Sequence, residues 1–531
     1  MSVKFLHPKT RQGAFETAGL RHRPNIILIT VDMISPDCYL PSRPLSQHIE
    51  TPNILSLLQQ GHRFNNAFTP SPLCGPARAA ICTGMHPPYL SNGERTPSGM
   101  KSDLEPGDLI FQDYLKQQGY NLKHVGKCHV GAPKFIETFG ENLHAWDRWG
   151  PPVMDDDRYI DYIGAMGVTA PRYSRELRGT LADRNTASTS FGGWIEQQNG
   201  DAFPRDAHYS VFLAELAIRQ LKASQMQAPG KPVFAQIDFF DPHQPYSIPH
   251  GYAQRYDYLR SVVQVPASFH DLQNAGGTDQ NPIFRLYHRY WGLYDEALVK
   301  DYIACHLLQV ELVDYAIGKL FAYLREAGLW DDSLILFTAD HGEMNGRLGL
   351  ADKGSYFHPD IFRVPMLVKP AGNRGVAAKD IATPVSLVDL APTILQAAGL
   401  EPAVQMEGAS LLDMVPTGSR PALEQVYQLG IHVGTNFGFG CQLPLGDTHW
   451  FYGYSATTGC EELYDLGAVE PVNVINDPAL TQVRARMVQH AATLMRSDKR
   501  WSGYFSSFRL HNMEHFMDES LDDIQMLKPQ A

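Results

Sequence analysis

The stretch Asn25–Val31 (NIILITV) decides the fold class of this chain. It is short, almost wholly apolar and rich in β-branched residues, which is the pattern of a strand buried on both faces of a largely parallel sheet. Asp32 follows directly, at the carboxyl end of the expected strand. We therefore expect an α/β fold in which a polar residue lies at the edge of a buried sheet.

The alternation of strand and helix continues through most of the chain. Further buried strands are predicted at 120–125, 233–239, 333–338 and 364–368, and helices at 51–61, 109–118, 299–326 and 387–398. Polar pairs follow three of these strands, namely Lys127 and His129, Asp241 and His243, and Asp340 and His341. Ligands of open α/β sheets bind outside the carboxyl ends of the strands, so we expect these separated residues to converge at one site.

Changes in pattern divide the chain into three parts. Residues 1–23 form an N-terminal extension, 24–414 the main α/β domain, and 415–531 a smaller subdomain with a small antiparallel sheet and a helix at about 478–496. Within the main domain, about 150–230 and 245–295 break the rhythm of strand and helix. We interpret both stretches as excursions over the site that shape what it accepts.

The charge balance limits the class of partner. The formal net charge of −12 is spread along the sequence without a long run of one sign, which argues against a nucleic-acid partner. It does not argue against an anionic small molecule. A few local cations can dominate a pocket while the remote acidic surface is screened by salt.

Cysteine usage and hydropathy favour a soluble, cytoplasmic protein without a membrane partner. The seven cysteines are odd in number and form no C-x-x-C pair, so no disulfide framework is expected. The first 23 residues lack the apolar core of a secretory signal, and the apolar runs are shorter than the roughly 20 residues that span a bilayer. One aromatic-rich stretch allows two interpretations, since it either mediates association into a homo-oligomer or covers the chain's own core. It contains Trp501, Tyr504, Phe505, Phe508 and Phe516.

The strongest local signal is the hexapeptide Leu73-Cys74-Gly75-Pro76-Ala77-Arg78, a C-x-P-x-R pattern at the start of an expected helix. By chance the pattern would occur in roughly a few per cent of chains of this length. A buried Cys before a helix with Pro in its first turn would explain it without any chemistry. The other motifs of the chain decide between the two interpretations.

Together the motifs resemble the formylglycine-dependent sulfatase family of the alkaline-phosphatase superfamily, from Asn25 to about Asp465. Besides Asp32 and the Cys74 pattern, they are Gly126-Lys127-Cys128-His129, Asp241-Pro242-His243-Gln244-Pro245-Tyr246, Thr338-Ala339-Asp340-His341-Gly342-Glu343, Lys353 before Arg363-Val364-Pro365, Ser386 to Gly399, and Glu462-Leu463-Tyr464-Asp465-Leu466. The resemblance implies an alkaline-phosphatase-like fold. It has a large mixed, mostly parallel sheet sandwiched by helices and a smaller C-terminal α+β subdomain.

The resemblance also implies a nucleophile and a metal site. In this family the Cys of C-x-P-x-R is oxidised to formylglycine by a separate maturation enzyme, which makes Cys74 the source of the nucleophile. The hydrated aldehyde offers one hydroxyl to attack and a second to expel the bound anion. The implied ligands of one divalent metal ion are Asp32, Cys74, Asp340 and His341. Without the family, a lone Asp or His at a strand end would more often serve a turn or cap.

Five further residues receive roles from the resemblance. Arg78 would hold the hydroxyls of residue 74, Lys127 would bind the ester oxygens, and His129 would be the base that triggers collapse. His243 and Lys353 would bind the bridging oxygen and protonate the leaving group. Taken singly, each would more often be a solvated cation or a satisfied histidine.

One position departs from the common family pattern. Many members have a second Asp directly after the first, whereas this chain has Met33, whose thioether is no ligand for a hard cation. The branch that uses a His ligand, which includes phosphonate monoester hydrolases, fits better. Calcium, manganese, magnesium and zinc therefore all remain candidates.

Three functions follow as hypotheses. The leading one is hydrolysis of a small-molecule sulfate monoester through a covalent sulfo-enzyme, which the retained Lys127 and His129 favour. A phosphonate monoester or phosphate diester hydrolase with the same nucleophile is the alternative that Met33 and His341 favour. The third is an unconverted relative that binds anions or metal without turnover. The leaving group cannot be read from the sequence.

Overall fold

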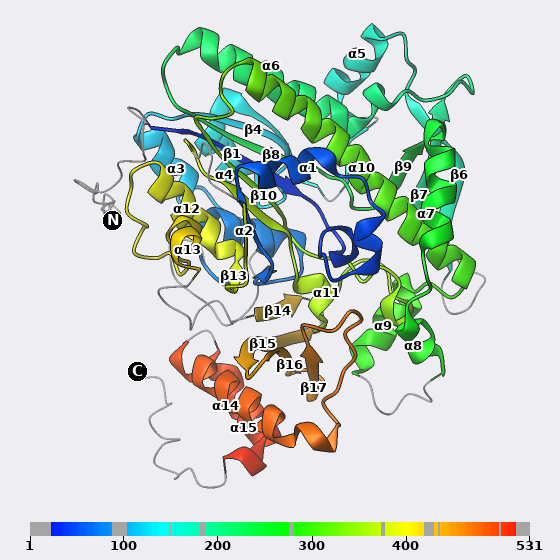
Figure 1. Ribbon diagram of the computed structural model, residues 1–531, viewed down its shortest axis with the longest axis vertical. Coiled ribbons are helices and arrows are strands. Elements are labelled where there is room, and N and C mark those ends of the chain that lie inside the picture. Colours follow the sequence, from blue (N-terminus) through cyan, green and yellow to red (C-terminus); the bar gives the residue numbers. More distant parts are fainter. Residues whose placement is uncertain are drawn as a thin grey trace.

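The stretch Asn25–Val31 forms β1, a central strand of an eight-stranded sheet in the computed structural model (Figure 1). The structure describes residues 23–87, 104–148, 150–153, 155–180, 187–274, 281–372, 378–418, 429–433, 436–498 and 501–516. The predicted N-terminal extension, 1–23, lies outside these residues apart from Arg23.

The central sheet has the strand order β12-β2-β11-β10-β1-β8-β4-β5. Its other strands are β2 (His62–Phe64), β4 (Asn121–Lys127), β5 (Leu143–Trp146), β8 (Val233–Asp238), β10 (Ser333–Ala339), β11 (Met366–Lys369) and β12 (Lys379–Ile381). β1 is parallel to β10 and β8, and β4 is parallel to β8 and β5, whereas β11 is antiparallel to β10 and β2. The prediction of a mixed, mostly parallel sheet is confirmed.

Helices cover both faces of this sheet, which explains why β8 and β10 are buried at every position and do not alternate. On one side α6 (Tyr209–Gln227) packs on β4 and β8 and against the long helix α10 (Glu296–Glu326). A second group consists of α2 (Cys74–Thr83), α3 (Phe111–Gln117) and α12 (Leu390–Ala397), which contact one another.

The prediction that all of 150–230 is an excursion is wrong. Its last part forms α6, a helix of the main layer that packs on the sheet and against α10. A helix enclosed by two neighbours is buried on several sides, so it lacks the single apolar stripe by which a surface helix is recognised. Even the polar Ser210 and Ser224 of α6 are buried.

The remaining parts of the two excursions meet in a separate three-stranded sheet. β6 (Pro171–Thr180) pairs antiparallel with β7 (Ala187–Gln197), and β7 pairs parallel with β9 (Tyr246–Pro249). At Gly192 a Cβ atom would lie 2.1 Å from the backbone nitrogen of Tyr246, so only glycine permits this approach. The helices of these stretches are α5 (Asp157–Ala165), α7 (Ala253–Val262), α8 (Asp271–Asn274) and α9 (Pro282–Trp291).

Short elements complete the main domain. They are the helices α1 (Pro52–Ser56), α4 (Ala132–Phe139), α11 (Pro359–Phe362) and α13 (Leu411–Thr417), and the paired strands β3 (Ala67–Phe68) and β13 (Val385–Ser386). The helix predicted to reach Gly61 is shorter than expected, because α1 gives way to a 3-10 turn at Leu57–Gln59.

The C-terminal part is a four-stranded antiparallel sheet with helices, as predicted. The sheet consists of β14 (Leu429–Val433), β15 (Asn436–Leu445), β16 (Thr448–Ser455) and β17 (Cys460–Asp465), followed by α14 (Thr481–Ser497) and α15 (Ser502–His511). Four of the aromatic residues of uncertain role are buried in the core between this sheet and its helices: Trp501, Phe505, Phe508 and Phe516. They cover the chain's own core, and oligomerisation stays a prediction.

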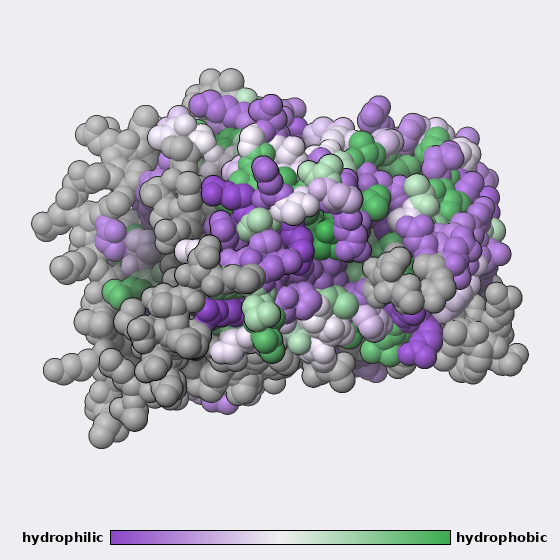
Figure 2. Space-filling view, turned by 90° about the horizontal axis from the view of Figure 1, so that it is seen from below, coloured by the Kyte–Doolittle hydropathy of each residue, from purple (hydrophilic) through white to green (hydrophobic). Residues whose placement is uncertain are grey.

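The surface is mixed in character. Figure 2 shows hydrophobic residues in small groups between hydrophilic ones on the face seen from below, as is usual for a surface in contact with water. No helix in the described ranges has both the length and the apolar character needed to cross a membrane. All seven cysteines lie in the described part of the chain, and none forms a disulfide.

Gly126, near the end of β4, provides a test of how closely the strands approach. Its φ is +106°, and an added Cβ would lie 1.9 Å from the carbonyl oxygen of Asp238 on β8. We expect Gly126→Ala to lower the free energy of unfolding by about 3 kcal/mol through backbone strain and overpacking. The matched control Gly119→Ala also has a positive φ, +84°, but meets no atom within 4 Å, and should cost only about 1 kcal/mol.

Urea denaturation of both variants measures the difference. Equal losses of stability would contradict the close packing of β4 on β8 at this position.

Candidate active site and metal centre

The ends of three parallel strands and the start of one helix meet at one edge of the central sheet. Asp32 follows β1, Asp340 and His341 follow β10, and Lys127 is the last residue of β4. Cys74 is the first residue of α2. The free N–H groups and the dipole of the first turn of α2 therefore point positive charge toward this edge.

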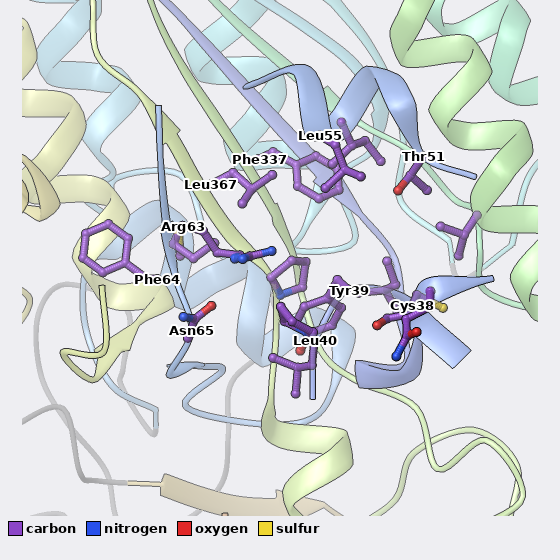
Figure 3. Close-up of a pocket in the computed structure, with 18 residues that line it drawn as sticks. Cys38, Tyr39, Leu40, Thr51, Leu55, Arg63, Phe64, Asn65, Phe337 and Leu367 are labelled. Atoms are coloured by element: carbon purple, nitrogen blue, oxygen red, sulfur yellow. The ribbon is translucent and has the colours of Figure 1, made fainter. Parts of the chain in front are cut away.

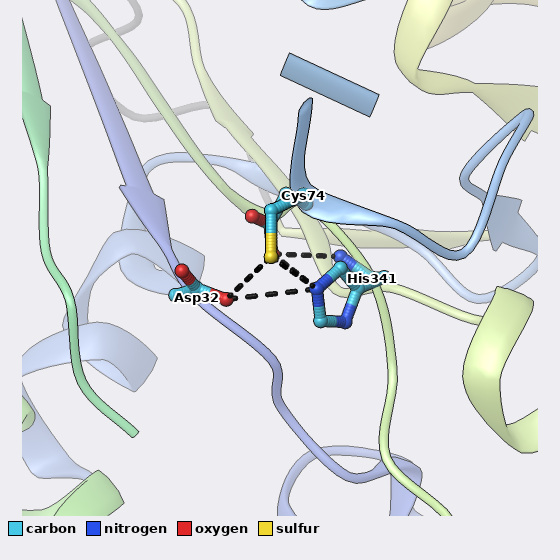
Figure 4. Close-up of side chains that lie close together, drawn as sticks. Asp32, Cys74 and His341 are labelled. Carbon is cyan, nitrogen blue, oxygen red and sulfur yellow. Dashed lines mark hydrogen bonds and ion pairs between the residues drawn. The ribbon is translucent and has the colours of Figure 1, made fainter. Parts of the chain in front are cut away.

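Four potential ligand groups converge there. One ligand atom from each of Asp32, Cys74, Asp340 and His341 lies within 4.8 Å of the others, and all four residues are buried. Cys74 Sγ lies 3.2 Å from His341 Nε2 and 3.7 Å from Asp32 Oδ1, and His341 Nε2 lies 3.6 Å from Asp32 Oδ1 (Figure 4). The structure thus brings together the complete predicted ligand set.

The backbone around the cluster orients its ligands. His341 Nδ1 donates to the carbonyl of Gly342 at 3.0 Å, which directs Nε2 toward the cluster. Asp340 Oδ1 accepts the backbone N–H groups of Met33, at 3.1 Å, and of His341, at 2.9 Å. Two carboxylates and one imidazole held in this way suit a divalent cation such as manganese, magnesium, zinc or calcium.

Two cations compensate the carboxylates. Arg78 Nε donates to Asp340 Oδ2 at 2.8 Å, and its Nη2 lies 3.5 Å from Asp32 Oδ2. Lys127 Nζ forms a direct ion pair with Asp32, and the Lys127 carbonyl accepts from Arg78 at 2.9 Å. The side chains of Asp32, Asp340 and Lys127 are fully buried, so neither carboxylate relies on water for its stability.

The pKa shifts follow from this arrangement of charges. Burial would raise the pKa of the Cys74 thiol, but Lys127, Lys353 and His341 outweigh it and hold that pKa well below its usual value. Burial would lower the pKa of His341, yet Asp340 and Cys74 raise it to about 9. The surroundings of Cys74 therefore stabilise a negative charge on its side chain. The surroundings of His341 stabilise a positive charge at its imidazole.

The remaining predicted residues surround residue 74. His129 lies next to the Cys74 side chain and helps to lower the pKa of its thiol, and the backbone of His129 has a positive φ of 48°. His243 Nε2 and Lys353 Nζ are 2.6 Å apart, although the two residues are 110 positions apart in the sequence. His243 Nδ1 donates to the carbonyl of Gln244 at 2.5 Å, so its Nε2 accepts from the Lys353 ammonium.

Three buried carboxylates near the site were not assigned a role from the sequence. Asp238, at the end of β8, lies 3.9 Å from Arg78 Nη1 and 2.8 Å from His124 Nε2. Asp352 precedes Lys353 and pairs with its ammonium at 3.0 Å. Glu343 belongs to the motif that contains Asp340, and it is fully buried. The available signal for Asp238 was a charged residue at the end of a mostly apolar strand.

A cavity of about 310 Å³ lies apart from this cluster, between β2, β10 and β11 and the segment after β1 (Figure 3). Its walls are mostly apolar, and Leu55, Phe337 and Leu367 are among them. None of the predicted site residues lines it. The chemistry of the charged cluster is therefore separate from this cavity.

Comparisons with known proteins agree with the motifs. Residues 24–400 match the family model described as Sulfatase. The chain is 26% identical over 422 residues to the multifunctional alkaline phosphatase superfamily protein PehA of Trinickia caryophylli, covering 75% of this chain and 78% of that one. It is 27% identical over 406 residues to an arylsulfatase of Clostridium perfringens, covering 74% and 78%.

Among solved structures, the phosphonate monoester hydrolase SpPMH of Silicibacter pomeroyi has the same fold. It superposes with a TM-score of 0.65 at 20% identity, covering 93% of this chain and 97% of that one. The likeness extends beyond the central sheet to nearly the whole length of both chains.

Metal binding can be tested by a matched pair of carboxylate variants. Asp32→Asn removes a charged ligand of the cluster, and we expect the affinity for manganese or zinc to fall by at least about 100-fold. Asp238→Asn alters a buried carboxylate that also adjoins Arg78 but lies outside the cluster, and it should retain metal.

Calorimetric titration and the metal content after dialysis measure both effects, and circular dichroism checks the fold. Equal metal binding by Asp32→Asn and the wild type would exclude Asp32 as a ligand.

Proposed function

The chain belongs to the sulfatase family, and we propose that it hydrolyses sulfate monoesters through a formylglycine made from Cys74 and one divalent metal ion. The observation that carries this proposal is the buried meeting of Cys74 with two carboxylates, an imidazole and the cations Arg78 and Lys127. Such a site can bind a metal and an oxyanion side by side. The substrate is a small-molecule sulfate ester.

The metal would be held by Asp32, Asp340, His341 and residue 74. Their oxygen and nitrogen atoms fit calcium, manganese, magnesium or zinc, and the orientation of His341 by Gly342 supports a nitrogen ligand. When bound, the ion supplies positive charge that lowers the pKa of the residue-74 hydroxyl and neutralises the ester oxygens. Arg78 lies next to both Asp32 and Asp340, which compensates the charge of these carboxylates and holds them in place.

The sulfur of Cys74 marks the place of the two hydroxyls of hydrated formylglycine. One hydroxyl attacks the sulfur atom of the substrate's sulfate group, which gives a covalent sulfo-enzyme and expels the alcohol. The second hydroxyl then loses its proton as the adduct collapses to the aldehyde and releases sulfate. His129 lies next to the Cys74 side chain, where it can take that proton. Lys127 has its ammonium group at Asp32, where it can also bind an ester oxygen.

His243 and Lys353 act on the leaving group in this proposal. Their 2.6 Å contact and the hydrogen bond from His243 to Gln244 make Lys353 the donor and His243 Nε2 the acceptor. Burial would lower the pKa of Lys353, but the neighbouring Asp352 outweighs it and raises that pKa, so the ammonium stays protonated. A proton held there can be delivered to the departing oxygen.

A second candidate function is the hydrolysis of phosphonate monoesters or phosphate diesters with the same nucleophile. The structural likeness to a phosphonate monoester hydrolase, the multifunctional relative and the presence of Met33 with His341 favour it. Lys127 and His129 favour sulfate, because the resemblance assigns this pair to sulfatases. We therefore propose sulfate as the preferred ester group, with turnover of the other two as a side activity.

Mass spectrometry of a tryptic digest tests the nucleophile. The peptide 64–78 contains Cys74 as its only cysteine, and conversion to formylglycine lowers its mass by about 18 Da. We expect active protein expressed with a maturation enzyme to contain this aldehyde and to react with a hydrazide probe. The next peptide, 79–95, carries Cys82 and should remain an ordinary thiol that iodoacetamide alkylates.

An unmodified Cys74 in active protein would refute the proposed nucleophile. Unmodified Cys74 in inactive protein despite the maturation enzyme would favour the unconverted, non-catalytic relative.

A substrate panel tests the preferred ester group. With nitrophenyl sulfate, a nitrophenyl phosphate diester and a phenylphosphonate monoester, we expect kcat/KM to be highest for the sulfate. Lys127→Ala should lower the sulfate rate by about 100-fold or more, since it removes a cation from the developing charge. Sulfate turnover that lags behind the other two by orders of magnitude would replace our choice with the second candidate.

A further inference from the structure

Lys353 is held by the residue before it. The carboxylate of Asp352 accepts both the backbone N–H of Lys353, at 2.8 Å, and its ammonium group, at 3.0 Å. The same ammonium contacts His243 Nε2 at 2.6 Å. Lys353 is thus fixed at both ends by Asp352, and this fixation sets the place where its ammonium meets His243.

The backbone of Asp352 has a conformation that few side chains favour. Its φ is +69°, in the left-handed region where glycine is the ordinary choice. Asparagine and aspartate are among the few other residues found there, because their short polar side chains can hydrogen-bond locally. The carboxylate is what glycine lacks, and here that carboxylate contacts Lys353.

Glu343 holds the unusual turn from the other side. Its Oε1 accepts the backbone N–H groups of Asp352, at 2.7 Å, and of Asn345, at 2.9 Å, and the hydroxyl of Tyr302 at 3.3 Å. Glu343 is fully buried and lies two residues beyond His341. The hydrogen bond from Asp352 to Glu343 therefore connects the segment after β10 to the turn that carries Lys353.

We propose that Asp352 and Glu343 are positioning residues for the proton donor of the leaving group, the Lys353–His243 pair. This inference rests on the proposed function and adds two residues to it. Neither carboxylate needs to touch the substrate. Asp352 orients the ammonium directly, and Glu343 acts through the backbone of Asp352.

The dependence of rate on the leaving group separates positioning from general stability. In nitrophenyl sulfate the leaving group is good and departs without a proton. In the unsubstituted phenyl sulfate the leaving group is poor and needs to be protonated. General acid catalysis contributes about 10²- to 10⁴-fold, so a misplaced donor should lower the phenyl ester rate by about 10- to 100-fold and the nitrophenyl rate by less than about threefold. A loss of folded protein would lower both rates equally.

Two variants of Asp352 isolate its carboxylate. Asp352→Gly keeps a residue that tolerates the left-handed backbone and removes the carboxylate, so we expect the full selective loss on the phenyl ester. Asp352→Asn keeps an acceptor oxygen and removes the charge, and it should lie between Asp352→Gly and the wild type. Equal losses on both esters, or no loss at all, would overturn the role of Asp352.

Glu343 is tested with a matched control in the C-terminal sheet. Glu462 is also buried, its pKa is likewise raised to about 8, and its Oε1 accepts from Asn281 at 2.8 Å. Glu343→Gln keeps the oxygen that holds Asp352 and should behave like the wild type, whereas Glu343→Leu should lose phenyl ester activity selectively. Glu462→Leu should leave the ratio of the two rates unchanged. A similar change of ratio in both Leu variants would overturn the role of Glu343.

A crystal structure of Asp352→Gly gives a readout that does not depend on activity. We expect the Lys353 ammonium to leave His243, and an unchanged contact would overturn the proposal. Failure of the proposed function has a different signature, because the wild type would then hydrolyse neither sulfate ester, whereas failure of the positioning role leaves wild-type turnover of both intact.

Discussion

The parallel pairing of β1 with β10 is the constraint on which the site depends. Its register places Val31 opposite Ala339, so the next residues, Asp32 and Asp340, leave the sheet side by side. Both are fully buried. Two carboxylates this close repel each other strongly in a low-dielectric interior, so the fold is stable only with cations placed between them. Arg78 meets this need by contacting both carboxylates.

This charge compensation also fixes the position of residue 74. Cys74 and Arg78 are four positions apart on α2, so their side chains lie on the same face of the helix, one turn apart. An arginine bound to Asp340 and Asp32 therefore holds the start of α2 against the ends of β1 and β10. The spacing of the C-x-P-x-R pattern follows from this geometry, with Pro76 in the first turn, where its missing N–H costs nothing.

The sequence predicted the parts of the site that follow from strand pattern and from motif. NIILITV and SLILFT are apolar enough to identify buried strands, and the residues after them could be placed at the carboxyl edge of the sheet. The layer formed by α6 was missed, because burial on several sides hides the helical period.

The hydrogen bond between His243 and Lys353 joins residues 110 positions apart. No local pattern contains such a contact, so only the family resemblance had paired them. Asp352 and Glu343 were missed for another reason: their partners are close in the sequence, but the contacts depend on the path of the turn after β10.

Part of the backbone strain of the molecule lies next to the same site. Within the described part of the chain, five non-glycine residues have a positive φ, namely Met33, His129, Asn345, Leu348 and Asp352. Such conformations cost about 1–3 kcal/mol each and persist only where surrounding contacts enforce them. Met33 follows Asp32 and donates its N–H to Asp340, and Asp352 donates its N–H to Glu343. In both cases a buried carboxylate accepts the N–H of the strained residue. The strain is therefore stabilised by hydrogen bonds to carboxyl groups next to the site, which links the precise placement of Asp32 and Lys353 to the same buried groups.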